Sequence, residues 1–173
     1  KKLTDIIIDA VGNTKIIAED LGVLTPNVVD LIKQTGFPGM KILEFGMDGP
    51  IDNPYLLHNF ETPNIIAYTG THDNDTLVGY LKSKKEEELK FICKYFNSES
   101  LDTLPDLIMR ALYASIADVV IVQMQDLLKL DNSARMNYPS TIGGNWKWRL
   151  VKDQYNLIDE KALYELAYIY GRI

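Results

Sequence analysis

The stretch NIIAYTGTHDND, residues 64–75, joins a short continuous run of apolar residues to a cluster of polar ones. A short apolar run without polar alternation is typical of a strand that is buried on both faces, as in a parallel sheet. The glycine and the polar residues that follow it indicate a loop. The stretch therefore predicts a buried parallel strand with His72, Asp73 and Asp75 at its carboxyl end.

The segments on either side predict a regular alternation of strands and helices. Three more apolar runs predict strands at residues 16–18, 40–45 and 118–125. Helical spacing of apolar residues predicts helices over 3–11 (ended by Gly12 and Asn13), 25–36 (Thr25 as N-cap, Pro26 first, Gly36 last), 73–81, 84–95, 103–115 and 157–171. This alternation predicts an α/β fold with helices covering a parallel sheet, either an open doubly wound sheet or part of a (β/α)8 barrel.

Polar residues follow each predicted strand at its carboxyl end. They are Glu19 and Asp20, Glu44 to Asp48, His72 with Asp73 and Asp75, and Gln123 with Gln125 and Asp126. Because the carboxyl ends of parallel strands meet at one edge of a sheet, we expect these side chains to form one site. Each also has a structural alternative as a helix cap, a loop residue or a member of an ion pair, and Gln123 and Asp126 fit a structural role well.

Composition excludes several classes of function. The formal net charge of -6 argues against nucleic acid and against an anionic membrane surface. No apolar run approaches the roughly 20 residues of a membrane helix. Cys93 is the only cysteine, which rules out an internal disulfide and fits a cytoplasmic protein. The chain has two histidines and no cysteine cluster, so the sequence does not predict a metal site. It also lacks a glycine-rich phosphate loop, and we expect no organic cofactor.

Carboxylates combined with aromatic residues suit sugar chemistry. Glycoside cleavage needs one carboxylic acid to protonate the leaving oxygen and a second carboxylate at the sugar carbon. The segment GGNWKWR, residues 143–149, adds Trp146, Trp148 and Asn145, which suit stacking on sugar faces and bonding of hydroxyls. The alternative is that both tryptophans are ordinary packing residues.

Five motifs, in order along the chain, are more specific than the spacing of apolar and polar residues. They are IIAEDLGVLTPNV (16–28), TGFPGMKILEF (35–45), NPYLLHNF (53–60), YTGTHDNDT (68–76) and SARMNYPSTIGGNWKWR (133–149). Together they resemble the 4-α-glucanotransferases, the amylomaltase or disproportionating-enzyme family. The resemblance implies a (β/α)8 barrel related to the α-amylases. It also implies retaining transfer of α-1,4-glucan segments between maltooligosaccharides in glycogen or starch metabolism, without a cofactor.

The same resemblance implies roles for individual residues. Glu19 would be the general acid/base, and Asp73 the carboxylate that binds and distorts the sugar at the reaction centre. His72 would bond hydroxyls of that sugar. Asp20, Asp48 and Asn145 are further candidates for substrate contacts.

One element of the family pattern is missing from this chain. The family's nucleophile lies in an Arg-x-Asp-His stretch, and none of the four arginines here is followed two residues later by Asp. We therefore expect residues 1–173 to be the carboxyl-terminal part of a catalytic barrel, about strands five to eight with additional helices. Its amino-terminal half would be absent and the chain alone inactive.

Several alternatives stay open. Unpaired strand edges of a partial barrel could form a homo-oligomer. The chain could also be a non-catalytic glucan-binding half-barrel, a piece of a related α-glucan hydrolase, or a purely structural α/β domain.

Overall fold

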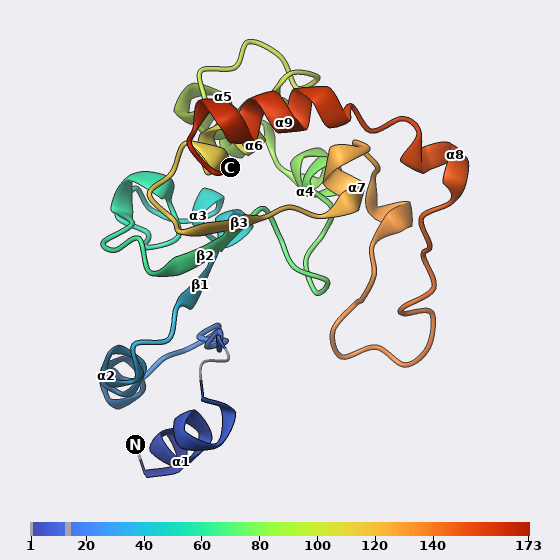
Figure 1. The fold of residues 1–173 in the computed structure, drawn as a ribbon. Coiled ribbons are helices and arrows are strands. Elements are labelled where there is room, and N and C mark those ends of the chain that lie inside the picture. Colours follow the sequence, from blue (N-terminus) through green and yellow to red (C-terminus); the bar gives the residue numbers. More distant parts are fainter. Residues whose placement is uncertain (1, 13–14) are drawn as a thin grey trace.

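In the computed structural model, which describes residues 2–12 and 15–173, three parallel strands form one sheet (Figure 1). The strands are β1 (Gly39–Ile42), β2 (Ile65–Tyr68) and β3 (Val119–Ile121), in the order β1-β2-β3. Ile66 pairs with Met40 on one side and with Val119 on the other. The sequence prediction of a parallel α/β fold is confirmed, and residues 64–75 supply the central strand.

Helices connect and flank the strands. They are α1 (Lys2–Val11), α2 (Pro26–Thr35), α3 (Leu43–Met47), α4 (Leu77–Ser83), α5 (Glu86–Tyr95), α6 (Leu104–Tyr113), α7 (Met124–Leu127), α8 (Lys152–Tyr155) and α9 (Glu160–Ile169), with short 3-10 turns η1 (Leu57–Asn59) and η2 (Asn132–Ala134). No helix in the described ranges is long and apolar enough to cross a membrane.

The ends of α2 follow the local sequence as predicted. Thr25 is its N-cap, Pro26 is its first residue, and Gly36 ends it with a φ of 70°. That left-handed conformation is the reason for glycine at this position. Helix α1 ends at Val11 as expected, while Asn13, predicted to help end it, lies outside the described residues.

The hydrophobic core lies on one side of the sheet. Ile65 and Ala67 of β2 pack there against Leu77 of α4, Ile92 of α5 and Ile108 of α6. In Figure 1, α4, α5, α6 and α9 gather on this side, and α1 and α2 lie at the other end of the molecule. The opposite face of the sheet carries the side chains from which the candidate site is built.

The strand predicted at residues 16–18 is not a regular strand. Ala18 donates one backbone hydrogen bond to the Pro38 carbonyl, over 2.9 Å. The next donor on β1, the Met40 N–H, is taken by the Asp20 side chain over 2.6 Å, and Pro38 has no N–H to give. A parallel ladder therefore cannot extend, and the segment lies beside β1 without joining the sheet.

Other predicted boundaries were too wide. The run 40–45 leaves the sheet after Ile42 and begins α3 at Leu43, and the run 118–125 ends as a strand at Ile121. The helix expected from residue 73 begins at Leu77. A continuous apolar run does not distinguish a buried strand from the buried helical turn that follows it, so the sequence alone merged them.

Candidate active site

The face of the sheet opposite the core forms one wall of a cavity of about 280 Å³. Met40 of β1, Tyr68 of β2 and Ile121 of β3 all line this cavity. Side chains alternate between the two faces of a strand, which is why Tyr68 and Ile121 face the cavity while Ala67 and Val120 face the core. The rest of the lining comes from Glu19, Leu21, Gly70, Thr71, His72, Asp73, Val122 and Gln123. We call this cavity the Glu19 pocket.

Four of the residues selected from the sequence line the Glu19 pocket, namely Glu19, His72, Asp73 and Gln123. Glu19 enters it from the segment beside β1, and His72 and Asp73 enter it from the turn that follows β2. The structure therefore brings the candidate acid/base and the candidate sugar-binding carboxylate to one cavity. Parallel strands make this possible because their carboxyl ends lie at the same edge.

The turn that carries His72 and Asp73 is held by a segment far away in the sequence. The Asn137 side-chain amide donates to Asp73 Oδ1 over 2.5 Å, and its backbone N–H donates to the His72 carbonyl over 3.1 Å. His72 Nε2 lies 3.4 Å from the same Asp73 oxygen. The Asp73 carboxylate thus has a fixed direction although it is about half exposed.

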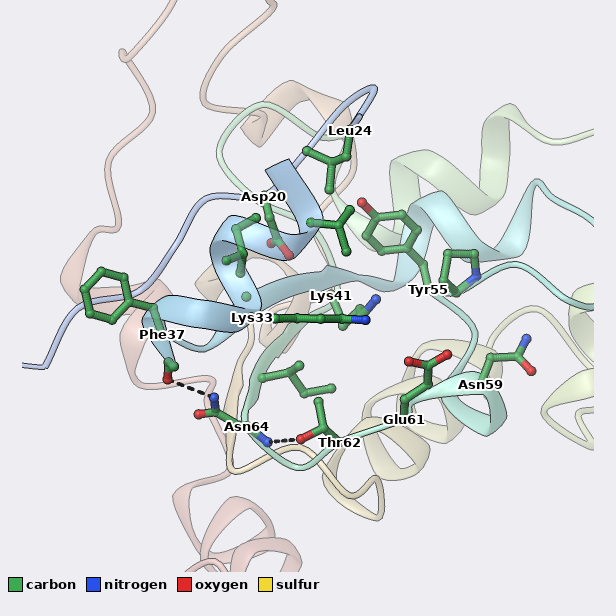
Figure 2. A pocket seen from close by; sticks show the side chains of 16 residues that line it. Asp20, Leu24, Lys33, Phe37, Lys41, Tyr55, Asn59, Glu61, Thr62 and Asn64 are labelled. Atoms are coloured by element: carbon green, nitrogen blue, oxygen red, sulfur yellow. Dashed lines mark hydrogen bonds between the residues drawn. The ribbon is translucent and has the colours of Figure 1, made fainter. Parts of the chain in front are cut away.

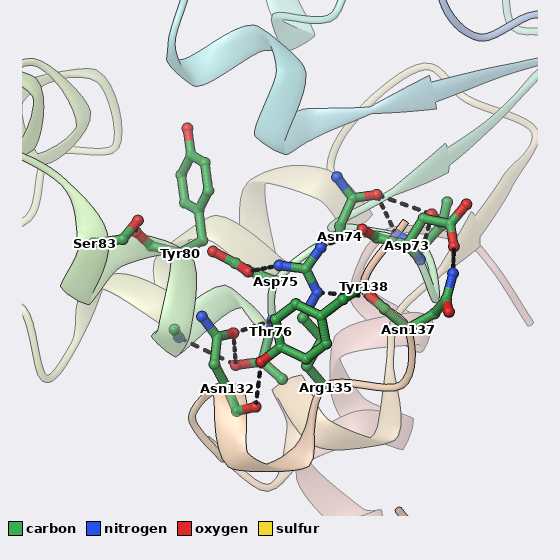
Figure 3. A network of polar contacts seen from close by, with 12 residues as sticks. Asp73, Asn74, Asp75, Thr76, Tyr80, Ser83, Asn132, Arg135, Asn137 and Tyr138 are labelled. Carbon is green, nitrogen blue, oxygen red and sulfur yellow. Dashed lines mark hydrogen bonds and ion pairs between the residues drawn. The ribbon is translucent and has the colours of Figure 1, made fainter. Parts of the chain in front are cut away.

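Arg135 is the second anchor of this turn (Figure 3). Its guanidinium pairs with the Asp75 carboxylate, donates to the Asp73 carbonyl over 2.6 Å, and donates to the Asn137 carbonyl over 2.8 Å. It also lies over the Tyr138 ring, 4.4 Å from the ring centre. A planar group with five donors can hold several acceptors at once, so one side chain joins both segments.

Trp146 lies against His72 at the side of the pocket. The two ring centres are 5.0 Å apart with an angle of 38° between the planes. The Trp146 backbone is left-handed, with a φ of 60°, and its N–H donates to the Met136 carbonyl over 2.7 Å. Half of this residue is exposed, which leaves an aromatic surface free beside the pocket.

Asp20 lies apart from its neighbour Glu19. Its carboxylate accepts from the Met40 N–H over 2.6 Å and contacts a larger cavity of about 690 Å³ between α2 and the outer side of β1 (Figure 2). Lys41 of β1 points into that cavity, and burial lowers the pKa of its ammonium group. Through this hydrogen bond Asp20 fixes the segment that carries Glu19 to β1.

Asp48 and Asn145 also lie outside the Glu19 pocket. Asp48 accepts from the Tyr80 hydroxyl over 2.6 Å and pairs with Lys84 over 2.6 Å. Asn145 accepts from the Tyr138 N–H and donates to the Thr141 hydroxyl, each over 3.0 Å. Each side chain holds local structure here, so a substrate contact for either of them stays a prediction.

A buried carboxylate supports the pocket from behind. Asp126 of α7 accepts from the Thr69 hydroxyl over 2.6 Å and from the Leu77 N–H over 2.7 Å. Burial raises the pKa of Asp126, and these two hydrogen bonds oppose that rise. Asp126 thereby links the end of β2 to the start of α4, the two ends of the His72–Asp73 turn.

Sequence reasoning did not find the roles of Arg135 and Asn137. Both belong to the motif SARMNYPSTIGGNWKWR, but nothing local in that motif indicates a contact with a turn some sixty residues earlier. Cys93 is partly buried against the hydrophobic core. Among residues 2–12 and 15–173, no three or more His, Cys, Asp or Glu side chains are grouped to hold a metal ion.

Comparison with known proteins decides the family. A sequence model described as 4-alpha-glucanotransferase matches residues 1–154. The chain belongs to the 4-alpha-glucanotransferase family. The 4-alpha-glucanotransferase of Streptococcus pneumoniae serotype 4 is 42% identical over 99% of this chain and 34% of its own length. The chloroplastic/amyloplastic 4-alpha-glucanotransferase of Arabidopsis thaliana is 44% identical over 100% of this chain and 30% of its own length.

The fold agrees with the solved structure of an amylomaltase. The amylomaltase from Streptococcus agalactiae, solved in complex with acarbose, superposes with a TM-score of 0.90 at 37% identity. The match covers 98% of this chain and 34% of that protein. The chain therefore spans about a third of the length of the relatives it matches.

Proposed function

We propose that this chain supplies the acid/base side of a retaining 4-alpha-glucanotransferase site, which moves α-1,4-glucan segments between maltooligosaccharides. The observation that carries the proposal is the meeting of Glu19, His72 and Asp73 in one pocket of a chain from this family. Glycoside cleavage with retention needs an acid/base carboxyl group and a nucleophilic carboxylate, and in this proposal Glu19 is the acid/base and Asp73 binds the sugar.

In the proposed reaction Glu19 acts twice. Its carboxylic acid first gives a proton to the glycosidic oxygen, and the leaving glucan departs with that proton while the sugar carbon bonds to a nucleophilic carboxylate. The Glu19 carboxylate then takes the proton from the 4-hydroxyl of an acceptor glucan. The acceptor oxygen bonds to the sugar carbon and the nucleophile leaves unchanged, which restores both carboxyl groups.

The neighbouring residues orient the sugar. Asp73 accepts hydrogen bonds from sugar hydroxyls, and Asn137 fixes the direction of its carboxylate. His72 bonds hydroxyls of the same sugar ring. The exposed face of Trp146 beside His72 offers a stacking surface for a glucose ring.

We propose that the nucleophile lies in a part of the catalytic barrel outside residues 1–173. No arginine of this chain is followed two residues later by Asp. In this proposal, the segment beside β1 and strands β1, β2 and β3 occupy about positions five to eight of the barrel. We further propose a cytoplasmic setting, whereas the Arabidopsis thaliana relative is chloroplastic/amyloplastic by name.

Complementation tests the proposal. The 173-residue chain is mixed with the remaining two thirds of the Streptococcus agalactiae amylomaltase, and maltotriose disproportionation is followed. We expect no transfer by either piece alone and transfer by the mixture, since only the mixture contains acid/base and nucleophile. Glu19→Gln should abolish transfer and leave maltooligosaccharide binding intact, while Glu99→Gln, at an exposed loop position, should change neither.

Other outcomes separate the alternatives. Transfer by the chain alone that is lost in Glu19→Gln would show that the nucleophile is in this chain. Glucan binding without transfer in the mixture would favour a non-catalytic binding module. Release of glucose without longer products would favour a hydrolase.

A further inference from the structure

Glu44 is an acidic residue that the proposed reaction does not use, and it lies inside the protein in α3, directly after β1. It is only 3% exposed. Its backbone N–H donates to the Thr69 carbonyl over 3.2 Å, and its carbonyl accepts from the Tyr80 hydroxyl over 3.1 Å. The backbone of Glu44 is therefore held on both sides, and its side chain lies in the interior.

The Glu44 carboxyl group faces Gly70, which lines the Glu19 pocket. A Cβ placed on Gly70 would lie 3.0 Å from Glu44 Oε1 and 3.1 Å from Gln123 Nε2, so the missing side chain of Gly70 provides the space. Glu44 Oε1 is buried and has no hydrogen-bond partner within the described ranges. A buried polar atom without a partner is costly, and a charged one is far more so.

The charged groups around Glu44 come from four places. Asp75 belongs to the turn before α4, Lys84 follows α4, Asp126 lies in α7, and Arg135 follows η2. Burial, and then the Asp126 and Asp75 carboxylates, raise the pKa of Glu44 well above its usual range. The opposing cations are already engaged, Lys84 with Asp48 and Arg135 with Asp75.

We propose that Glu44 is a positioning residue of the Glu19 pocket. Held beneath Gly70 without a charge, it leaves the Arg135 guanidinium on Asp75 and on the Asp73 carbonyl. An ionised Glu44 would be a further buried carboxylate that attracts Arg135 and repels Asp75. The contacts of Arg135 with the His72–Asp73 turn would weaken, and the Asp73 carboxylate would no longer be held in one direction. Only the effect on transfer rests on the proposed function.

The direction of the pH dependence follows from the raised pKa. In the unfolded chain Glu44 ionises near its ordinary value, about 4.3. The folded state retains the proton to higher pH, so the Glu44 contribution to stability is complete below that value. It falls as pH rises toward the folded-state pKa. Glu44→Gln has nearly the same shape and cannot ionise, so its stability should not show this decline.

The test compares wild type, Glu44→Gln and Glu99→Gln in the protein at its natural length. Urea unfolding is measured at several pH values from about 4 to about 9. This range covers the titration expected for a carboxyl group whose pKa is raised. We expect Glu44→Gln to match wild type at the lowest pH and to become progressively more stable than wild type as pH rises. Glu99→Gln should follow wild type throughout.

Maltotriose transfer gives the second readout. Because Glu44→Gln cannot ionise, the alkaline decline of its transfer rate should lie at higher pH than the alkaline decline of wild type. If no variant shows transfer, the proposed function fails, and the unfolding curves still decide the role of Glu44.

A stability difference between Glu44→Gln and wild type that stays constant with pH would overturn the inference.

If Glu44→Gln does not fold, infrared spectra of wild type with ¹³C-labelled glutamate test the protonation state of Glu44 instead. A protonated glutamate band at neutral pH supports the proposal, and the absence of that band at every pH above the ordinary glutamate range contradicts it.

Discussion

At the scale of single residues, the direction of Asp73 depends on one side-chain amide. Asn137 donates to Asp73 Oδ1 over 2.5 Å and is itself fixed by its backbone bond to the His72 carbonyl. A hydrogen bond to a charged acceptor contributes more than a neutral one, and catalysis is sensitive to small errors of orientation. Asn137 is therefore expected to matter for transfer more than for folding.

Asn137→Ala should lower the rate of glucan transfer by about tenfold, which corresponds to roughly 1.4 kcal/mol of lost transition-state stabilisation. Its unfolding free energy should change little, because the side chain is partly exposed. Transfer rates and urea unfolding check both statements in the complemented enzyme. Asn64→Ala, which loses a side-chain bond to the Gly36 carbonyl outside the Glu19 pocket, is the matched control. Equal transfer rates for the two variants would contradict a role of Asn137 in orienting Asp73.

At the scale of elements, two helix starts with the same N-cap residue differ in their contacts. The Thr76 hydroxyl accepts from the Gly79 N–H over 3.1 Å at the start of α4, and Thr76 is buried. Thr25 at the start of α2 makes no side-chain cap bond and is exposed. The same residue type therefore contributes differently to the two helices.

Thr76→Ala should lower the free energy of unfolding by about 1–2 kcal/mol, the range for a lost cap bond. Thr25→Ala should lower the free energy of unfolding by only a small fraction of that amount, because its side chain makes no cap bond. Urea unfolding of the two variants measures the difference. Similar losses at both positions would mean that the cap bond of Thr76 does not stabilise α4.

The element scale also shows where sequence prediction succeeded. Proline at the start and glycine at the end located α2 to the residue, since both act through local backbone geometry. The same local rules missed the end of β1, because Leu43 and Glu44 are as buried in α3 as they would be in a strand. They also missed that the Asp20 side chain takes the hydrogen bond that a strand at 16–18 needed.

At the scale of the whole molecule, the sheet has an edge without a neighbour in the described part of the chain. Strand β3 pairs only with β2, and its Val119 is 42% exposed. An unpaired strand with exposed apolar side chains is a template for association. We therefore expect the isolated chain to self-associate through this edge.

Sedimentation of the 173-residue chain should show association that increases with concentration. Val119→Lys should reduce it several-fold, because a charged side chain on an edge strand opposes pairing. Val23→Lys, at a fully exposed loop position away from the sheet, should leave association unchanged. A stable monomer at high concentration would contradict the expected role of the edge.

The sequence by itself indicated the α/β class, the family and four of the residues that line the Glu19 pocket. Periodicity, caps and ordered motifs carry that information because each acts over a few neighbouring residues. Only the tertiary structure decided that Asp20 faces β1 while Glu19 faces the pocket. It alone joined Arg135 and Asn137 to the His72–Asp73 turn, and it alone buried Glu44 beneath Gly70. These contacts join distant segments, and no local pattern encodes which side chain will lie opposite another after the strands align.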